Sequence, residues 1–416
     1  MKVSVITLGC KVNEYESQSM LNQFKQAGYE IAEGLVPADI YVLNTCAVTN
    51  EGERKSRQML SKIQKLNKDA QIVVCGCAAE HNPNNFLCNS NVVALCGCHG
   101  KNDVLGLLKN KNRTLMKTPT TYAPFLKPIE TRTRQYIKIQ DGCDYFCTYC
   151  LIPYMRGRSR SRDMADILEE IKSTTASEIV LTGINMSDYR IDGKLALKTL
   201  VKEVDKLNKR FRISSIECNV LDDEMLETLR NAKNFCPHFH LSLQSACNST
   251  LKRMNRHYTI EKFISITDKI KKLFPEGFIS TDLIVGFKGE TDEEFEDTLK
   301  NLKRIGFNTM HVFPYSVRSG TVASKLSGDV DGNIVKARLK RLTELNNNFK
   351  TEFFNKNLNT NHKVLVEVVD KNNSFGYTDN YIYTYLPAGY KVGEIVEVKL
   401  TKQHKNGMIG EILAKN

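Results

Sequence analysis

The sequence predicts a three-part α/β protein. It comprises an amino-terminal parallel α/β domain, a central partial (βα)6 barrel of the TIM type and a small antiparallel β-barrel at the carboxyl end. Three observations predict it. Short apolar runs alternate with helical patterns up to about residue 110, the alternation resumes with a longer period over 134–318, and the chain then changes to polar–apolar alternation with turn signals. We expect domains at 1–112, 133–356 and 357–416, and a linker at 113–132.

The first domain has the pattern of a parallel sheet. Apolar runs of the β type occupy 3–8, 39–44, 71–75 and 92–95, and helical patterns cover 16–27 and 52–66. Strands that alternate with helices in this way build βαβ units, whose strands run parallel. The Thr- and Pro-rich stretch that follows interrupts the pattern and is typical of a linker.

Six βα repeats follow and indicate a barrel. The expected strands are 135–140, 178–182, 213–217, 239–243, 279–285 and 309–314, and the expected helices are 164–174, 197–208, 223–232, 260–273 and 293–305. In such a barrel the functional site lies at the carboxyl ends of the strands. His238 and His240 alternate along the fourth strand, and we interpret both as core histidines whose hydrogen bonds are satisfied.

The end of the chain predicts a long helix at 335–355 and a small barrel with strands at 363–370, 381–386, 395–400 and 408–413. This barrel combines basic and aromatic side chains, as surfaces that bind single-stranded RNA do. The residues are Lys391, Lys399, Lys402, His404 and Lys405, with Tyr377, Tyr381, Tyr383 and Tyr385. The tyrosines could equally serve as packing residues.

Composition narrows the function classes. The chain has 416 residues, 13 cysteines and a net charge of +12. No run approaches the ~20 apolar residues of a membrane span, and no signal peptide is recognisable, so we expect a cytoplasmic protein that does not bind membranes. In a reducing compartment, grouped cysteines favour metal binding over disulfides. The positive charge suits a nucleic-acid partner, although solvated lysines alone would also explain it.

The strongest motif is a cysteine triplet after the first barrel strand. Cys143, Cys147 and Cys150 have the spacing C-x3-C-x2-C. A short loop of this kind lets three thiolates hold one face of a 4Fe–4S cluster and leaves one iron open. Zinc usually takes two separated C-x2-C pairs, and no second pair follows this triplet. The triplet therefore predicts a reactive iron–sulfur centre.

A second set of cysteines occurs in the first domain. Cys10, Cys46 and Cys77 follow three successive expected strands. Because the carboxyl ends of parallel strands share one edge, we expect the three thiols to converge and hold a second 4Fe–4S cluster; buried structural thiols are the alternative. We prefer Cys77 to Cys75, since Cys75 belongs to the strand itself. Cys88, Cys96 and Cys98 could form a separate metal site, but we favour free thiols.

The triplet, at the end of the first strand of a βα barrel, resembles the radical S-adenosylmethionine superfamily. The resemblance implies that the open iron binds S-adenosylmethionine and that a reduced cluster releases a 5′-deoxyadenosyl radical from it. It also implies cofactor contacts by Tyr149 beside the adenine, Gln244 at the ribose and Gly286 close to the adenine. Lys288 stands where proline is usual, which puts the rigidity of that loop in doubt.

The whole chain resembles the methylthiotransferase family of these enzymes. The matching stretches include Thr7-Leu-Gly-Cys-Lys-Val-Asn13, Asn44-Thr-Cys-Ala-Val-Thr49, Val180-Leu-Thr-Gly-Ile-Asn185 and Phe313-Pro-Tyr-Ser316. The resemblance implies two 4Fe–4S clusters, a terminal RNA-binding TRAM domain, an electron donor such as flavodoxin or ferredoxin, and a monomer.

Three branches of that family differ in substrate. The first two stretches most resemble the branch that converts N6-threonylcarbamoyladenosine 37 of tRNA to its 2-methylthio form. The same chemistry on isopentenyladenosine in tRNA, or on an aspartate of a ribosomal protein, is the alternative. A different class is an RNA-binding protein with a structural metal cluster.

Four arginines follow the triplet: Arg156, Arg158, Arg160 and Arg162. We expect at least two of them to contact tRNA phosphates, because positive charge beside the reactive centre would hold the RNA backbone there. A solvated charge run, or one arginine that pairs with the S-adenosylmethionine carboxylate, is the alternative.

Overall fold

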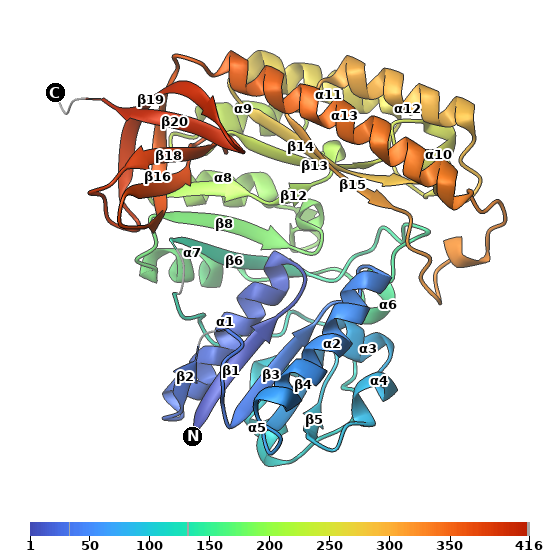
Figure 1. Cartoon of the computed structure of the whole chain (residues 1–416), viewed down its shortest axis with the longest axis vertical. Coiled ribbons are helices and arrows are strands. Elements are labelled where there is room, and N and C mark those ends of the chain that lie inside the picture. The colour runs from blue at the N-terminus through green and yellow to red at the C-terminus, as the bar shows by residue number, and fades with distance from the viewer. Residues whose placement is uncertain (33, 131–132, 414–416) are drawn as a thin grey trace.

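The amino-terminal domain, the barrel and the terminal barrel are distinct units in the computed structural model, which describes residues 1–32, 34–130 and 133–413. In Figure 1 the amino-terminal domain lies beneath the barrel, and the terminal barrel lies at its left end. The predicted fold class is confirmed.

A five-stranded parallel sheet forms the first domain, in the order β2-β1-β3-β4-β5. The short edge strand β2 was not predicted, because three residues give too little pattern. Helix α1 begins at Lys11, before its predicted start, since polar residues such as Asn13 and Glu16 are buried and hide the apolar period. The elements are β1 (Lys2–Thr7), α1 (Lys11–Gln26), β2 (Glu30–Ala32), β3 (Ile40–Thr45), α2 (Asn50–Leu66), β4 (Gln71–Gly76), α3 (Cys77–His81), α4 (Asn84–Leu87), β5 (Val92–Leu95) and α5 (Val104–Lys109).

The barrel consists of two four-stranded sheets, β11-β8-β6-β7 and β12-β13-β14-β15. The predicted strand at 213–217 is divided between β11 and β12, where Ser214 interrupts the pairing and the first sheet gives way to the second. The strands are β6 (Arg134–Asp141), β7 (Arg160–Ser161), β8 (Glu178–Gly183), β11 (Arg210–Ile213), β12 (Ser215–Ile216), β13 (His238–Gln244), β14 (Phe278–Val285) and β15 (Thr309–Pro314).

Helices cover the outside of the barrel strands, and their apolar faces form one core with the outward-facing strand residues. These helices are α7 (Met164–Ser173), α8 (Leu197–Asp205), α9 (Asp223–Asn231), α10 (Asn248–Arg253), α11 (Ile260–Leu273) and α12 (Asp292–Ile305). Helix α6 (Ile152–Arg156) instead packs against the first domain, and its Met155 belongs to the core of that domain. A small hairpin, β9 (Arg190–Ile191) with β10 (Lys194–Leu195), interrupts the βα order.

The long helix α13 (Gly332–Lys356) leads into a closed five-stranded barrel, ordered β16-β17-β18-β20-β19. Strand β17 was not predicted. Its Gly376 lies so close to β16 that an added Cβ would come within 1.9 Å of the Leu365 carbonyl oxygen. The strands are β16 (Asn361–Val369), β17 (Asn373–Tyr377), β18 (Tyr383–Pro387), β19 (Ile395–His404) and β20 (Gly407–Ile412). Within the described ranges, no helix combines the length and apolar character that a bilayer span needs.

Buried charges join the terminal barrel to the amino ends of the central strands. Glu178, at the start of β8, accepts from Arg212 at 2.7 Å, and Arg212 also donates to the carbonyl oxygens of Thr378 and Asp379, each at 2.7 Å. His238 stacks between Phe278 and Tyr381, with ring centroids 5.3 and 4.4 Å away, as expected of a core histidine. The terminal barrel therefore covers the end of the central barrel opposite the cysteine triplet.

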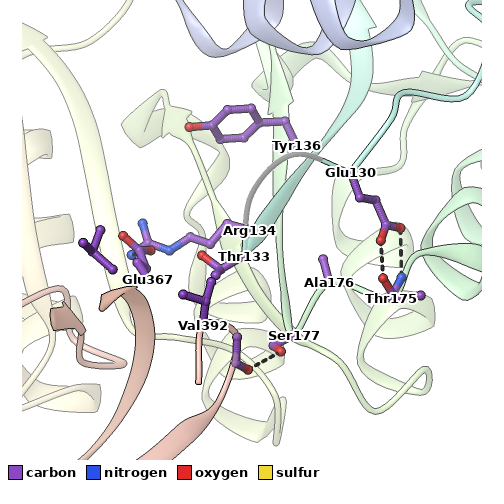
Figure 2. Close-up of a pocket in the computed structure, with 11 residues that line it drawn as sticks. Glu130, Thr133, Arg134, Tyr136, Thr175, Ala176, Ser177, Glu367 and Val392 are labelled. Carbon is purple, nitrogen blue, oxygen red and sulfur yellow. Dashed lines mark hydrogen bonds and ion pairs between the residues drawn. The ribbon is translucent and has the colours of Figure 1, made fainter. Parts of the chain in front are cut away.

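A polar cavity of about 650 Å³ lies at this junction (Figure 2). Arg134 reaches across it to Glu367 of β16, and Ser177 donates to the Gly393 carbonyl oxygen at 2.6 Å. Because the cavity lies at the amino ends of β6 and β8, it is remote from the carboxyl ends, where the chemistry of such barrels takes place.

Candidate metal centre

The cysteine triplet occupies the loop at the carboxyl end of β6. Gly142 opens this loop with φ +74°, and an added Cβ would lie 2.0 Å from the Arg158 carbonyl oxygen, so only glycine fits. The backbone N–H of Cys143 donates to the Gly157 carbonyl oxygen at 3.1 Å. The loop is thus tied to the segment after α6, and this holds the first thiol in place.

The three thiols are half-buried, and polar N–H groups face two of them. Arg256 Nη1 donates to Cys147 Sγ at 3.2 Å, and the Tyr145 backbone N–H donates to Cys143 Sγ at 3.5 Å. Burial raises the pKa of Cys143 to about 11 and that of Cys150 to about 12. Both are therefore protonated at neutral pH until a bound cation favours the thiolates, as expected of metal ligands.

The three free thiols supply the donor atoms that a 4Fe–4S cluster takes. Among the residues that the structure describes, no three His, Cys, Asp or Glu side chains gather tightly enough to hold one metal ion. A 4Fe–4S cluster takes each thiolate on a different iron, so its ligands stand further apart than those of zinc. The triplet and its donors fit the cluster.

Arg256 is the centre of the polar network below the triplet. It is buried, and its Nη2 pairs with Glu217 and donates to the Ser242 carbonyl oxygen at 2.7 Å. Its Nε donates to the Tyr258 hydroxyl at 3.2 Å. One side chain therefore connects a triplet thiol to β13 and to the carboxylate that follows β12. The sequence predicted no role for Arg256, because its partners are distant in the chain.

The three predicted cofactor contacts lie on the same end of the barrel. Tyr149 packs against Phe287, with ring centroids 6.4 Å apart, in an apolar group that also includes Ile284. Gln244 ends β13 with φ +68°. Gly286 has φ +72°, and an added Cβ would lie 2.5 Å from Val335 Cγ2, so packing alone also explains this glycine. These contacts stay predictions.

The loop after Gly286 is held in place although it lacks the usual proline. Lys288 is buried, its ammonium pairs with Asp329, and its carbonyl oxygen accepts from Arg253 Nε at 3.2 Å. Side-chain contacts therefore fix the loop where a proline ring would have restricted it.

The first-domain cysteines gather at the edge of the sheet that faces the barrel. An added Cβ on Gly9, next to Cys10, would lie 3.0 Å from Cys46 Sγ. The Cys46 pKa rises to about 11, mainly through burial and also through nearby Cys77 and Cys10. Cys77 begins α3 directly after β4. The structure thus brings Cys10, Cys46 and Cys77 together.

A fourth thiol joins this group. Cys98 Sγ lies 3.7 Å from Cys77 Sγ, and its hydrogen bond is the main cause of a lowered pKa at Cys77, together with the nearby charges of Arg156 and Lys101. Cys75 and Cys96 are instead packed in the apolar core on the other side of the sheet, and Cys88 is exposed. One feature of the sequence could have indicated the contact between Cys77 and Cys98: the pairs Cys75-x-Cys77 and Cys96-x-Cys98 have the same spacing.

Buried charges connect the two thiol groups. Arg156 is fully buried between the domains, where its Nη1 contacts Glu16 at 2.9 Å and Asp141 at 3.0 Å. Lys138 contacts the same two carboxylates, each at 2.7 Å. Burial lowers the Arg156 pKa, but Glu16 and Asp141 outweigh it and raise that pKa, so the guanidinium stays charged.

Three of the four arginines expected to supply phosphate contacts are engaged within the protein, which contradicts the expectation that at least two of them contact phosphates. Arg156 and Arg160 are buried, and Arg160 donates to the carbonyl oxygens of Arg156 and Arg158, each at 2.8 Å. Arg162 pairs with Glu170 and donates to the Tyr15 hydroxyl at 3.2 Å. An arginine at every second position resembles a run of surface charges in the sequence. This segment passes between two domains, however, and most of its arginines are therefore not at the surface. The side chain of Arg158 is 72% exposed, so its contact with a tRNA phosphate stays a prediction.

Two family models match the chain. The model of the radical SAM superfamily matches residues 137–302, and the model described as "Uncharacterized protein family UPF0004" matches residues 2–98. A threonylcarbamoyladenosine tRNA methylthiotransferase, MtaB, from Bacillus subtilis is 37% identical over 422 residues, which cover 96% of this chain and 94% of that protein. The chain belongs to the methylthiotransferase family of radical SAM enzymes.

Other members of the methylthiotransferase family match as fully. MtaB of Thermotoga maritima is 36% identical over 98% of this chain and 96% of its own. A tRNA-2-methylthio-N(6)-dimethylallyladenosine synthase from Natranaerobius thermophilus is 32% identical over 99% of this chain and 96% of its own. Membership makes this chain an enzyme and implies a 4Fe–4S cluster and S-adenosylmethionine as cofactors.

Solved structures share the fold at low sequence identity. The radical S-adenosylmethionine methyltransferase TsrM from Kitasatospora setae has a TM-score of 0.56 and 11% identity, covering 75% of this chain and 74% of that one. The apo form of the radical enzyme OxsB has a TM-score of 0.55 and 12% identity, covering 84% of this chain and 56% of that one.

Proposed function

We propose that this methylthiotransferase acts on N6-threonylcarbamoyladenosine beside the anticodon of tRNA and adds a methylthio group at C2 of the base. The observation that carries the proposal is the set of MtaB proteins at 32–37% identity over nearly the whole chain. Relatives named for dimethylallyladenosine reach 32–33%. The partner is therefore tRNA, which implies a cytoplasmic site of action.

The proposal includes a second 4Fe–4S cluster on Cys10, Cys46 and Cys77. Three thiols at adjacent strand ends, one with a lowered pKa, support it. When bound, the two clusters would supply the electron that cleaves S-adenosylmethionine and an open iron that carries sulfur. A small electron carrier such as flavodoxin or ferredoxin would supply that electron, and we propose a monomer.

The chain's own residues would hold and orient this chemistry. Cys143, Cys147 and Cys150 would bind the first cluster, and Arg256 would donate to one of its ligating sulfurs. Tyr149, Gln244 and Gly286 would contact S-adenosylmethionine. Arg156 and Glu16 would fix the two thiol groups relative to each other, because both are buried at the contact of their domains.

Mass spectrometry of tRNA tests the proposal. A strain that lacks this gene should lose 2-methylthio-N6-threonylcarbamoyladenosine and keep the 2-methylthio derivatives of isopentenyladenosine. The wild-type gene should restore the lost nucleoside, and a Cys147→Ala variant should not. Loss of the isopentenyl derivatives instead would overturn the assignment of substrate.

A further inference from the structure

A group of polar side chains lies on the inner face of the barrel below the triplet and has no part in the functions assigned so far. It consists of His240 on β13, Ser280 and Asp282 on β14, and His311 on β15, and we name it the inner polar cluster. Strand register places Ser280 beside His240 and His311 beside Asp282. The cluster therefore spans three neighbouring strands at one level.

Strand alternation fixes which way these side chains point. Leu241, Leu283 and Met310 belong to the core under the outer helices. Their neighbours His240, Asp282 and His311 consequently face the inside of the barrel, because successive residues of a strand point to opposite faces. His240 is a satisfied histidine, as predicted: its ring contacts Ser280 Oγ at 3.0 Å and Asp282 Oδ2 at 3.1 Å. The sequence did not predict that these partners line the inside of the barrel.

The inner polar cluster is accessible, unlike a purely structural ion pair. The side chain of Asp282 is 32% exposed and that of His240 is 13% exposed, while His311 is exposed. Phe313, the next inward-facing residue of β15 after His311, is 46% exposed. These exposed side chains are therefore accessible to a ligand that places polar groups beside Asp282 and an aromatic ring near Phe313.

The position of the inner polar cluster along the strands places it next to the cysteine triplet. Ser242 follows His240 on the same face, about 6.6 Å along the strand, and its carbonyl oxygen accepts from the Arg256 that contacts Cys147. On β14, Ile284 follows Asp282 on the inner face and packs in the same apolar group as Tyr149. The inner polar cluster therefore lies one inward-facing residue below the triplet and its network.

The positive charge of Lys11, from the first domain, also acts on the inner polar cluster. Burial raises the pKa of Asp282, but the hydrogen bond from His240, with the charges of His240, His311 and Lys11, lowers it overall. Lys11 is adjacent in the chain to Cys10, a predicted ligand of the second cluster. Burial lowers the pKa of His311, so its ring is neutral at pH 7 and can donate and accept hydrogen bonds.

We infer that the inner polar cluster, with Lys11, binds the threonylcarbamoyl substituent of the substrate base and selects it over an apolar substituent. This inference rests on the proposed function. The substituent carries a carboxylate, a hydroxyl and a urea group. Lys11 supplies positive charge for the carboxylate, and Asp282 and His311 supply hydrogen-bond partners for the urea and the hydroxyl. A dimethylallyl group would leave these polar side chains unpaired, which is costly.

Binding and turnover with RNA stem–loops test the inference. The variants are Asp282→Asn, which keeps the shape, His311→Leu and Lys11→Met. Asp297→Asn and Lys303→Met, on the exposed outside of α12, are the controls. Anticodon stem–loops that carry threonylcarbamoyladenosine, isopentenyladenosine or plain adenosine are titrated into reconstituted protein. Iron content, and 5′-deoxyadenosine formation without RNA, show that each variant is intact.

We expect each cluster variant to weaken binding of the threonylcarbamoyl stem–loop, and to lower its kcat/KM, by about tenfold or more. Affinity for the plain adenosine stem–loop should not change, and the controls should behave as wild type. Variants that keep the wild-type kcat/KM and affinity for the threonylcarbamoyl stem–loop would overturn the inference. Failure of the wild type to modify that stem–loop at all would instead overturn the proposed function, so the two failures are distinguishable.

Discussion

Arg156 and Glu16 form an ion pair in which both side chains are fully buried at the contact between the first domain and the barrel. The pair lies between the two thiol groups, because Arg156 follows the triplet loop and Glu16 lies on the helix that begins after Cys10. In the proposed function, a radical produced at one site would act on a base that must also reach the other, which requires a fixed separation of the two sites. We interpret this ion pair as the element that fixes it.

The first prediction concerns removal of one partner. Glu16→Gln leaves Arg156, Lys101 and Lys138 without their common carboxylate. Because an uncompensated buried charge is costly, we expect a loss of about 3–5 kcal/mol in the free energy of unfolding. Urea denaturation followed by circular dichroism measures it. Glu51→Gln, which removes a solvent-exposed ion pair with Arg54, is the matched control and should change the midpoint much less. Equal effects of the two variants would contradict the prediction.

The second prediction concerns acid stability at the other junction. Burial raises the pKa of Glu178, but Arg212, Arg210 and Arg134 outweigh it and lower the pKa to about 2. In the unfolded chain a glutamate titrates near 4.3. The ionised form therefore stabilises the fold above about pH 4.3, and this contribution, roughly 3 kcal/mol, is lost as pH falls towards 2.

Denaturation at a series of pH values tests whether the free energy of unfolding falls towards low pH, as this argument requires. Wild-type stability should fall between about pH 4.5 and 2, and Glu178→Gln should be less stable at neutral pH and lose less over that window. Glu227→Gln, on the exposed face of α9, should follow the wild-type curve. A Glu178→Gln curve parallel to that of the wild type would contradict the assignment.

The third prediction concerns the hydrogen bond from Arg256 to Cys147. A donor to a ligating sulfur stabilises the reduced, more negative cluster and raises its potential. Arg256→Gln should therefore lower the reduction potential of the triplet's cluster by about 60 mV, the equivalent of roughly 1.4 kcal/mol. Potentiometric titration monitored by EPR measures it. Arg253→Gln, three residues earlier and paired with Glu294, should leave the potential unchanged; an equal shift in both variants would rule out the specific role of Arg256.

The sequence predicted what depends on local spacing and regular alternation. Cys143, Cys147 and Cys150 lie within one loop, so their convergence needs no knowledge of the fold. Cys10, Cys46 and Cys77 could be grouped because parallel strands end at one edge. Each of these predictions used a rule that can be applied to the sequence without knowing which distant side chains come into contact.

What the sequence missed depends on contacts between distant segments. Arg156 looks like a surface charge until α1 covers it with Glu16, and Arg160 is buried against carbonyl oxygens of its own segment. Arg256 and Cys147 lie 109 residues apart in the chain, so only the folded barrel brings them into contact. The hydrogen-bond partners of His240 could not be named, because Ser280 and Asp282 come from another strand. Burial and pairing of polar side chains are set by tertiary packing, which local patterns do not report.

The fourth prediction separates Cys77 from Cys98, which lie only 3.7 Å apart. If Cys77 is the ligand and Cys98 its hydrogen-bond donor, Cys77→Ser should reduce the iron content of reconstituted protein from about eight to about four per chain. Cys98→Ser should keep about eight, because a serine hydroxyl can still donate a hydrogen bond to the Cys77 sulfur. Iron analysis with Mössbauer spectroscopy measures both, and Cys88→Ser, at an exposed thiol, is the control.

The opposite pattern of iron contents would identify Cys98, and not Cys77, as the cluster ligand. Sulfur ligands on different irons of one cluster cannot stay as close as Cys77 and Cys98 now lie, since each iron holds its own thiolate. One of the two must therefore remain outside the cluster. The direct position of Cys77 after β4, at the strand ends with Cys10 and Cys46, and its lowered pKa favour Cys77 as the thiolate. Loss of half the iron in Cys98→Ser, with full iron in Cys77→Ser, would show that the neighbouring strand supplies the ligand instead.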